Sequence, residues 1–361
     1  PIWHKEIEDI IVLKNNKGTE DNRVRKLDYS IQISKLFYER FINDEEITLF
    51  SPHEVPELYE AWGSPEFDEL YEKAERKTSV SKSKVSAQTL FFDMLKERAE
   101  TGRIYIMNID HCNSHSSFKD KVYMSNLCQE ITLPTKPIQH IDDSEGEIAL
   151  CILSAINLGL IKDKEDLEEL CELSVRALDE IIDYQEYPVE AAKKSTEARR
   201  SLGIGYIGLA HYLAKNKVKY DDKEALKLVD EVTEAFQYYL LKASNDLAKE
   251  KGQCEYFDRT KYSDGILPID TYKKELDNIV KRKLSYDWNN LRKTIKEHGL
   301  RHSTLSAQMP SESSSVVSNA TNGVEPPRDY LSVKKSKKGP LKQIVPDFNR
   351  LKNFYTLLWD M

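Results

Sequence analysis

The sequence predicts an α/β fold in which helices alternate with short parallel strands. Two observations lead to this class. Several segments have the 3.6-residue apolar period of amphipathic helices, and short runs of strand-forming residues lie between them. With 361 residues, the chain has the length of two domains of about 150 residues or of one larger domain.

The first 120 residues contain two helical patterns, each followed by the pattern of a strand. Apolar residues recur with the helical period over 28–42, and 47–50 is a short strand candidate. Residues 86–99 have the pattern of an amphipathic helix that ends near a glycine, and 103–107 have the pattern of a strand. The polar stretch 111–120 is expected to be a loop.

The longest nearly apolar run is 148–161, which is interrupted only by Ser154 and Asn157. A helix needs about 20 apolar residues to cross a bilayer, so this run is too short to do so. We therefore expect it to be a buried segment of the core.

Three longer helices are expected in the second half of the chain. Residues 164–184 begin with acidic side chains, which the positive end of a helix dipole favours. The helical patterns over 222–251 and 285–298 are each followed by a glycine that can end a helix. Residues 349–359 have the pattern of a last helix. Strands are predicted at 202–207, 301–305 and 343–346.

The balance of charge argues against two classes of protein. The chain has 53 Lys and Arg against 61 Asp and Glu, which gives a net charge of −8 and a pI of about 5.7. General nucleic-acid binders and polybasic membrane-surface proteins usually carry a basic excess. Charged residues make up 32% of the chain, so we expect a well solvated surface.

The five cysteines do not have the pattern of a disulfide framework. Their number is odd, their spacing is irregular, and no two of them form a CxxC pair. The charges throughout residues 1–17 do not fit a secretory signal. We therefore expect a reducing, cytoplasmic compartment.

Residues 203–208, Gly-Ile-Gly-Tyr-Ile-Gly, match the GxGxxG pattern of dinucleotide-binding folds. That pattern also needs an acidic residue about twenty positions further on. Its identity is ambiguous here, since Asp221 and Asp222 are both candidates. We favour a strand that passes close to a neighbouring backbone.

Metal sites are weakly indicated. His111, Cys112 and His115, with Cys128 as a further ligand, resemble part of a zinc site, but no second close pair of ligands follows. A di-iron carboxylate site needs Glu-x-x-His on a helix, and none of the eight histidines has a glutamate three residues before it. We therefore expect no metal site in this chain.

The segment 125–131, Ser-Asn-Leu-Cys-Gln-Glu-Ile, carries the most informative side chains. If the segment is extended, Asn126, Cys128 and Glu130 share one face at intervals of about 6.6 Å. Glu130 would then suit a general base for a substrate hydroxyl that Asn126 orients. A nearby carboxylate raises the pKa of a thiol, which favours a neutral thiol or a thiyl radical over a thiolate. A half-exposed strand with its polar side in water is the simpler alternative.

Residues 309–315, Met-Pro-Ser-Glu-Ser-Ser-Ser, form a second candidate site. Hydroxyl residues after a proline suit the start of a helix. Such an N-terminus offers N–H groups and a positive dipole to a phosphate. The carboxylate of Glu312 fits beside a phosphate only if the backbone of that residue makes the contact. A capped helix without a ligand is the alternative.

Over the whole chain, these segments resemble the large, catalytic subunit of aerobic (class I) ribonucleotide reductases. The two most specific signatures are Asn-Leu-Cys-x-Glu at 126–130 and Met-Pro-Ser-Glu at 309–312. Further matching stretches lie at 101–106, 133–137, 146–151, 265–274, 319–323 and 325–328.

The resemblance implies reduction of ribonucleoside diphosphates to deoxyribonucleoside diphosphates by a thiyl-radical mechanism. Cys128 would become the thiyl radical that abstracts the ribose 3′-hydrogen. Glu130 would take the proton of the 3′-hydroxyl, and Asn126 would hold the substrate hydroxyls. Cys151 would be one of two cysteines that are oxidised to a disulfide as the 2′-hydroxyl leaves as water.

The resemblance also implies a substrate-binding role for Glu312, Ser313 and Ser314. They would bind the substrate diphosphate, mainly through backbone N–H and hydroxyl groups. The family often has threonine where this chain has Ser313, so a hydroxyl is retained. The remaining cysteines match no catalytic position and are expected to be structural: Cys112, Cys171 and Cys254.

The fold that the resemblance implies is a ten-stranded α/β barrel of two five-stranded halves, with the radical cysteine on a central finger loop. Residues 1–361 would form a single incomplete catalytic barrel domain: the end of the first half-barrel, the finger loop and most of the second half-barrel. We expect the N-terminal effector-binding cone, the partner cysteine of Cys151 and the C-terminal tail to lie outside this chain.

No cofactor is expected to bind the chain directly. The resemblance implies that the metal cofactor of a separate small subunit supplies the radical. ATP and deoxynucleotide effectors would bind segments outside this chain. The other implied partners are complementing large-subunit segments, thioredoxin or glutaredoxin, and a second copy in a homodimeric holoenzyme, with no nucleic acid and no membrane.

The isolated chain is expected to be inactive without complementing segments and a small subunit. The alternative is a catalytically inactive barrel fragment that is retained for binding nucleotide or the small subunit. The presence of all four of Asn126, Cys128, Glu130 and Cys151 argues against it, because a binding module has no need of the whole set.

Overall fold

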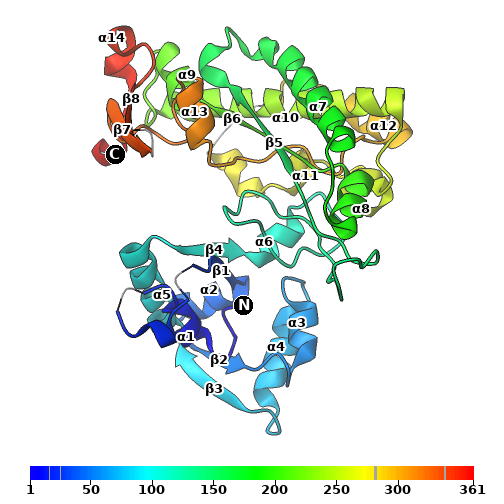
Figure 1. The fold of residues 1–361 in the computed structure, drawn as a ribbon, viewed down its shortest axis with the longest axis vertical. Helices are drawn as coiled ribbons and strands as arrows, with labels where there is room; N and C mark the ends of the chain where they lie inside the picture. The colour runs from blue at the N-terminus through cyan, green and yellow to red at the C-terminus, as the bar shows by residue number, and fades with distance from the viewer. Residues whose placement is uncertain (16, 25, 280–282, 337–338) are drawn as a thin grey trace. The chain divides into compact units, whose positions relative to one another are not determined.

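The computed structural model describes residues 1–15, 17–24, 26–279, 283–336 and 339–361 (Figure 1). These residues divide into two compact units. The first consists of Pro1–Ser116 and Lys121–Leu133, and the second of Ser117–Asp120 and Pro134–Met361. No helix in the described ranges is long and apolar enough to cross a membrane.

The first unit packs short helices around two pairs of strands. Strands β1 and β4 pair in parallel, with Ile31 opposite Ile106, and β2 and β3 pair antiparallel. Its core includes Trp62, whose ring centroid lies 4.6 Å from that of Phe67. The elements are α1 (Ile7–Ile11), β1 (Tyr29–Ile33), α2 (Lys35–Ile42), β2 (Glu46–Phe50), α3 (Pro56–Ala61), α4 (Phe67–Arg76), β3 (Lys82–Ser86), α5 (Ala87–Thr101), β4 (Ile104–Asn108) and α6 (Ile109–Ser114).

Most of the expected elements of the first unit are confirmed. The predicted strands at 47–50 and 103–107 are β2 and β4. The predicted helix at 86–99 is α5, which begins after Ser86, whose hydroxyl accepts the N–H of Thr89 (3.3 Å), and ends at Gly102, which has a φ of 66°.

Two expectations in the first unit are wrong in part. The predicted helix over 28–42 is helical only in α2, because Tyr29–Ile33 alternates apolar and polar residues and pairs with β4 as strand β1. Pairing in this register buries Ile31 and Ile33. The predicted loop at 111–120 begins inside helix α6, which ends at Ser114.

The second unit contains the longer helices and a buried pair of parallel strands. Figure 1 shows α7 and α10 beside β5 and β6, and all four elements contribute to one apolar core. Its elements are β5 (Ile152–Asn157), α7 (Leu167–Tyr184), α8 (Glu190–Arg199), β6 (Leu202–Ile207), α9 (Leu209–Lys215), α10 (Lys223–Lys251), α11 (Pro268–Thr271), α12 (Trp288–His298), α13 (Glu312–Val317), β7 (Leu331–Ser336), β8 (Gly339–Ile344) and α14 (Phe348–Leu351).

Strand β6 is buried along its whole length and pairs with β5 in parallel. On its other side the chain at 301–307 runs beside it, with the N–H of Ile204 donating to the carbonyl of Leu305 (2.8 Å). The strand predicted at 301–305 is therefore an extended segment, with a single parallel bridge between Ile204 and Ser306. An added Cβ on Gly205 would lie 2.3 Å from the carbonyl oxygen of Ala307, so the interpretation of 203–208 as a strand close to a neighbouring backbone is confirmed.

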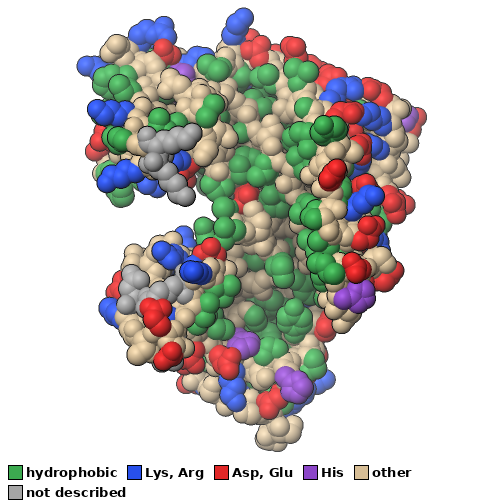
Figure 2. Space-filling view, viewed as in Figure 1, with side chains coloured by type: hydrophobic (Ala, Val, Ile, Leu, Met, Phe, Trp, Pro, Cys, Tyr) green, Lys and Arg blue, Asp and Glu red, His purple; other side chains and the backbone are tan. Residues whose placement is uncertain are grey.

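The helices predicted at 164–184, 222–251 and 285–298 are confirmed as α7, α10 and α12. Helices α10 and α12 end at Gly252 and Gly299, as the glycine positions predicted. Figure 2 shows basic and acidic side chains intermixed over the region of α7 and α12, which fits the well solvated surface expected from the composition.

Three expectations in the second unit are wrong in part. The run 148–161 forms β5 but is only partly buried, since Leu160 is 70% exposed. The strand predicted at 343–346 is the end of β8, which starts at Gly339 and pairs antiparallel with β7. The helix predicted at 349–359 forms only in part. Helix α14 ends at Leu351, a 3₁₀ turn follows over Lys352–Phe354, and Tyr355 and Thr356 make tertiary contacts instead. The hydroxyl of Tyr355 donates to the carbonyl of Pro346 (2.8 Å), and the hydroxyl of Thr356 donates to Asp221 (2.8 Å).

The α/β class is confirmed, with parallel pairing in β1–β4 and β5–β6 and antiparallel pairing in β2–β3 and β7–β8. The strands of the described residues form four separate two-stranded sheets, and they do not close into a barrel.

Candidate active site

Asn126 closes a tight turn that carries Cys128. The backbone N–H of Asn126 donates to the carbonyl of Ile131 (3.1 Å), and the side-chain oxygen of Asn126 accepts the N–H of Ile131 (3.1 Å). Gln129 has a φ of 67°, and its N–H donates to the carbonyl of Asn126 (3.3 Å). The extended segment that would place Asn126, Cys128 and Glu130 on one face is therefore wrong. An asparagine that hydrogen-bonds the backbone favours a turn over a strand.

The chain that leads into this turn is held by two amide side chains of the first unit. Asn113 makes two hydrogen bonds to the backbone of Val122. Its side-chain oxygen accepts the N–H of Val122 (2.9 Å), and its Nδ2 donates to the carbonyl of Val122 (3.1 Å). Gln32 of β1 donates to the carbonyl of Tyr123 (2.6 Å) and accepts the indole N–H of Trp62 (2.7 Å). The approach to Cys128 is thus tied to the core of the first unit.

The surroundings of Cys128 favour a neutral thiol. Burial raises the pKa of Cys128, and the negative charge of Glu130 raises it further. One carboxylate oxygen of Glu130, Oε2, is buried and accepts no hydrogen bond from the described residues. The turn therefore offers a thiol that keeps its proton and an acceptor that is open to a ligand hydroxyl.

Cys151 lies in the second unit, directly before β5, with its sulfur against β6. An added Cβ on Gly203 would lie 2.7 Å from the sulfur of Cys151 and 2.6 Å from a methyl of Leu153. The absence of a side chain at Gly203 therefore makes room for the Cys151 thiol. The structure shows no disulfide among the described residues.

Glu312, Ser313 and Ser314 occupy the first turn of α13, also in the second unit. The helix start predicted from 309–315 is confirmed. The hydroxyl of Ser311 donates to the carbonyl of Met309 (3.2 Å) and does not cap the helix. The first N–H groups of a helix have no partner within it, so they suit an anion.

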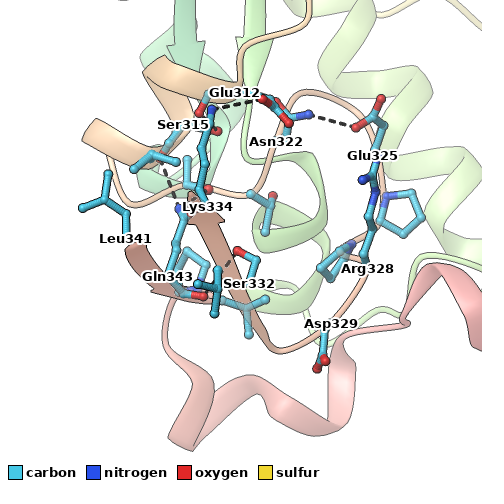
Figure 3. A pocket seen from close by; sticks show the side chains of 18 residues that line it. Glu312, Ser315, Asn322, Glu325, Arg328, Asp329, Ser332, Lys334, Leu341 and Gln343 are labelled. Atoms are coloured by element: carbon cyan, nitrogen blue, oxygen red, sulfur yellow. Dashed lines mark hydrogen bonds and ion pairs between the residues drawn. The ribbon is translucent and has the colours of Figure 1, made fainter. Parts of the chain in front are cut away.

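Glu312 lines a pocket of 260 Å³ between α13, the chain at 320–329 and the β7–β8 hairpin (Figure 3). Lys334 of β7 reaches Glu312 (3.0 Å), and Asn322 donates to Glu325 (2.9 Å). Thr321, which is only 7% exposed, has a hydroxyl without a hydrogen-bond partner in the described residues. Ser313 and Ser314 are exposed and are not part of this lining.

Sequence reasoning did not identify Thr321, Asn322 and Lys334 as neighbours of Glu312. The stretch 319–323 contributed to the family resemblance but carried no assigned role. Lys334 lies beside Glu312 only because the hairpin folds back, and no local pattern indicates that contact.

Three of the four residues considered as zinc ligands, His111, Cys112 and His115, lie on or beside α6, whereas Cys128 lies in the turn at 126–131. The rings of His111 and His115 are 5.4 Å apart, and Cys112 packs against the apolar core of the first unit. Within the part of the chain that the structure describes, no group of three or more His, Cys, Asp or Glu side chains is placed to hold a metal ion.

Comparison with known proteins identifies the family. A family model described as "Ribonucleotide reductase, barrel domain" matches residues 1–357. The chain belongs to the ribonucleotide reductase family.

Among similar proteins, the ribonucleoside-diphosphate reductase subunits alpha of Buchnera aphidicola (subsp. Schizaphis graminum) and of Haemophilus influenzae are both 59% identical to it over the whole chain. The subunit alpha of Enterobacteria phage T4 is 46% identical, again over the whole chain. The chain spans 48% of the length of each of these three relatives. As a member of this reductase family, it matches about half of a subunit alpha.

Proposed function

We propose that this chain supplies the radical-bearing part of the large subunit of a ribonucleoside-diphosphate reductase. The observation that carries the proposal is the turn at Asn126–Ile131, which joins a thiol of raised pKa to a buried carboxylate oxygen without a hydrogen-bond partner. Family membership supports it, because the relatives bear the name of that enzyme. The substrate would be a ribonucleoside diphosphate and the product its deoxy form.

In the proposed reaction, a radical from the metal cofactor of a separate small subunit removes the hydrogen atom of the Cys128 thiol. The resulting thiyl radical takes the 3′-hydrogen atom of the ribose, and Glu130 takes the proton of the 3′-hydroxyl. Asn126 orients the substrate hydroxyls. The 2′-hydroxyl leaves as water while Cys151 and a second cysteine become a disulfide. The two thiols supply two electrons and two protons, one of which completes the water and the other of which is added at C2′. Cys128 then returns the hydrogen atom to C3′.

The diphosphate of the substrate would bind at the first turn of α13. The backbone N–H groups of Glu312, Ser313 and Ser314 and the two serine hydroxyls are the proposed donors. The ion pair with Lys334 draws the Glu312 carboxylate toward β7, which favours a backbone contact at Glu312.

The complete enzyme would need further parts. We propose that residues 1–361 belong to one barrel domain, with Cys128 on its finger loop, and that complementing segments of the large subunit complete the ten-stranded barrel. ATP and deoxynucleotide effectors would bind those other segments. The remaining proposed partners are the small subunit, a second large subunit, and thioredoxin or glutaredoxin to reduce the disulfide.

Substitution of Cys128 in the complete large subunit, assayed with its small subunit, tests the proposal. We expect Cys128→Ser to abolish formation of deoxynucleotide, because a hydroxyl does not form the required radical. Cys112→Ser is the matched control, since Cys112 is also half-buried in the first unit but has no proposed role. Turnover by Cys128→Ser at the rate of the unmodified enzyme would rule the proposal out. Nucleotide binding without turnover in the unmodified holoenzyme would favour the inactive binding module instead.

A further inference from the structure

Two arginines and two carboxylates form a compact ion cluster in the second unit. Arg199, only 2% exposed, donates through Nε to Glu147 (2.8 Å), and its Nη2 lies 2.9 Å from the carboxylate of Asp120. Arg259 contacts the same two acids, at 2.8 Å from Asp120 and 3.4 Å from Glu147. Each arginine thus joins Asp120 to Glu147.

Two aromatic rings lie against the arginines of the cluster. The guanidinium of Arg199 lies 5.1 Å from the ring centroid of Tyr256 and 5.7 Å from that of Phe118, and the guanidinium of Arg259 lies 4.3 Å from Tyr256. Cation–π contacts strengthen the cluster, and burial strengthens the pair of Arg199 and Glu147, whose side chains are 2% and 6% exposed.

Backbone hydrogen bonds fix the chain beside both carboxylates. Next to Asp120, the N–H of Lys119 donates to the carbonyl of Arg259 (2.9 Å). Glu147 exchanges two backbone hydrogen bonds of 3.0 Å with Lys136. The backbone is therefore anchored at Glu147 and at the residue before Asp120, in addition to the side-chain ion pairs.

The position of these two acids in the sequence gives the cluster its significance. Asp120 directly precedes, and Glu147 directly follows, the segment 121–146. That segment contains Asn126, Cys128 and Glu130, the proposed radical site. The cluster joins the two ends of the segment through side chains.

We propose that Arg199, assisted by Arg259, is a positioning residue for Cys128: it clamps together the two ends of the segment that carries the radical cysteine. The inference rests on the proposed function of Cys128. Arg199 touches no reacting atom and acts only through the path of the chain. A thiyl radical must meet one hydrogen atom of the substrate, so a small displacement of the segment slows the reaction.

Arg200 provides a matched control because it is the next residue and is also buried. Its guanidinium binds Asp179 (2.6 Å) and Asp183 (2.7 Å), both on α7. Neither acid flanks the segment 121–146. Arg199→Lys and Arg200→Lys each keep one positive charge but lose the planar guanidinium group. The two variants therefore differ mainly in which carboxylates lose their arginine partner.

The experiment uses the complete large subunit with its small subunit and compares the two lysine variants. We expect Arg199→Lys to lower kcat by about tenfold or more, because a misplacement of about 1 Å can cost about 100-fold in rate. The KM for the nucleoside diphosphate should change less, because the proposed diphosphate donors lie on α13. Arg200→Lys should keep kcat close to that of the unmodified enzyme.

A second readout does not depend on turnover. Iodoacetamide labelling of each cysteine is followed by peptide mass spectrometry in the same samples. We expect Arg199→Lys to raise the labelling rate of Cys128 while the buried Cys171 and Cys254 stay protected, which separates a released segment from general unfolding. Arg200→Lys should leave the labelling of Cys128 unchanged.

A second pair of variants uses partly exposed arginines, whose substitution is less damaging to folding. Arg259→Gln removes the ion pairs of Arg259 to both acids, and its side chain is 39% exposed. Arg292→Gln is its control, since Arg292 binds Asp270 and is 26% exposed. We expect Arg259→Gln to reproduce the effects of Arg199→Lys on kcat and Cys128 labelling, and Arg292→Gln to produce neither.

Equal losses of kcat in the Arg199 and Arg200 variants, or unchanged Cys128 labelling in both Arg199→Lys and Arg259→Gln, would overturn the inference. Its failure is distinguishable from failure of the proposed function. Turnover by Cys128→Ser would reject the function, whereas the labelling comparison reports on the clamp without any turnover.

Discussion

Arg199 and Arg200 are adjacent in the chain, yet their guanidinium groups bind separate sets of carboxylates. Arg199 is the last residue of α8, and Arg200 has a φ of 46°, so the chain leaves the helical path between the two side chains. Arg199 contacts Asp120 and Glu147, and Arg200 contacts Asp179. One turn after α8 therefore stabilises two regions of the second unit that are distant in sequence.

Asp179 is the centre of the second of these clusters and is completely buried. It accepts hydrogen bonds from Arg200 (2.6 Å), Arg301 (3.2 Å) and Nε2 of His302 (3.1 Å). Burial alone would raise the pKa of Asp179, but the hydrogen bonds from His302 and Arg200 outweigh it and leave the pKa lowered. Asp179 is therefore ionised, and its charge is balanced mainly by the arginines.

His302 gives this cluster a predictable pH dependence. Burial lowers the pKa of His302, and the attraction of Asp179 only partly opposes this. The ring is therefore neutral in the folded protein, with Nε2–H donating to Asp179 and Nδ1 accepting from Ser244 (2.9 Å). In the unfolded chain the ring binds a proton near its ordinary pKa of about 6.5.

We predict that the free energy of unfolding decreases as the pH falls from about 7 to about 5, because the unfolded state then binds a proton that folded His302 does not. Asp179 does not cause this change, since its lowered pKa affects stability only below the ordinary aspartate range. Urea denaturation at several pH values measures the slope. His302→Gln should make it shallower and leave the contribution of His211, whose pKa burial also lowers. An equal slope in the variant would contradict the assignment of His302 as neutral.

Gly203→Ala is predicted to displace the Cys151 thiol. The new methyl group would clash with the sulfur of Cys151 and with Leu153 and Ala307, and overpacking of this kind costs about 1–3 kcal/mol. We expect a lower melting temperature and a changed rate of Cys151 alkylation in the folded protein.

Gly205→Ala is the control for this substitution. It lies on the same strand and would clash with Ala307 and Met309 but not with Cys151. It should destabilise the protein in the same way and leave the alkylation of Cys151 unchanged. If both variants change it equally, the contact between Gly203 and Cys151 is not the cause.

The sequence predicted an element correctly where nearby residues determine its ends or its packing. Helix α5 begins after Ser86 and ends at Gly102, and β6 carries glycines where a neighbouring backbone passes. The prediction failed where a distant contact decided the local structure. Tyr29–Ile33 is a strand because β4 lies beside it, and α14 stops early because Tyr355 and Thr356 bond elsewhere.

The candidate site shows the same limit. The sequence identified Asn126, Cys128 and Glu130 as candidate site residues, but it did not predict their arrangement. The side chain of Asn126 accepts a hydrogen bond from Ile131 and holds the chain in a turn. No sequence pattern indicated a functional role for Arg199. Its importance depends on Asp120 and Glu147, which only the fold brings together.

The pair Arg40–Glu75 is predicted to stabilise the first unit. Both nitrogens of the guanidinium fork donate to the carboxylate at 2.7 Å, and the hydroxyl of Thr48 donates to it at 2.6 Å. Burial raises the pKa of Glu75, but Arg40 and Thr48 outweigh it, so the pKa is lowered and the carboxylate is ionised. Glu75→Gln should reduce the free energy of unfolding by about 2 kcal/mol, as for other hydrogen bonds to charged groups.

Denaturation of the purified protein by urea measures this change. Glu39→Gln is the control, because it breaks the exposed ion pair of Lys35 and Glu39, and such pairs contribute little. If the two substitutions reduce the free energy of unfolding equally, burial of the Glu75 carboxylate does not increase the stability that its ion pair contributes.

The cysteines of the folded protein are predicted to differ in reactivity with an alkylating agent. Burial raises the pKa of Cys254 to about 12 and also raises that of Cys171, so both should resist labelling. Cys128 is less buried, and its pKa is raised by burial and then by Glu130. It should therefore react faster than Cys171 and Cys254, because the thiolate is the reactive form.

Glu130→Gln tests the electrostatic part of this prediction. Removal of the negative charge should lower the pKa of Cys128, increase its thiolate fraction and raise its labelling rate at mildly alkaline pH. Glu145→Gln removes an exposed carboxylate that has no interaction with Cys128 and should leave the rate unchanged. Labelling followed over a range of pH separates a shift in pKa from a change in access, since access alone scales the rate equally at every pH. A pH profile of Cys128 labelling that is identical in Glu130→Gln and the unmodified protein would show that Glu130 does not act on the thiol.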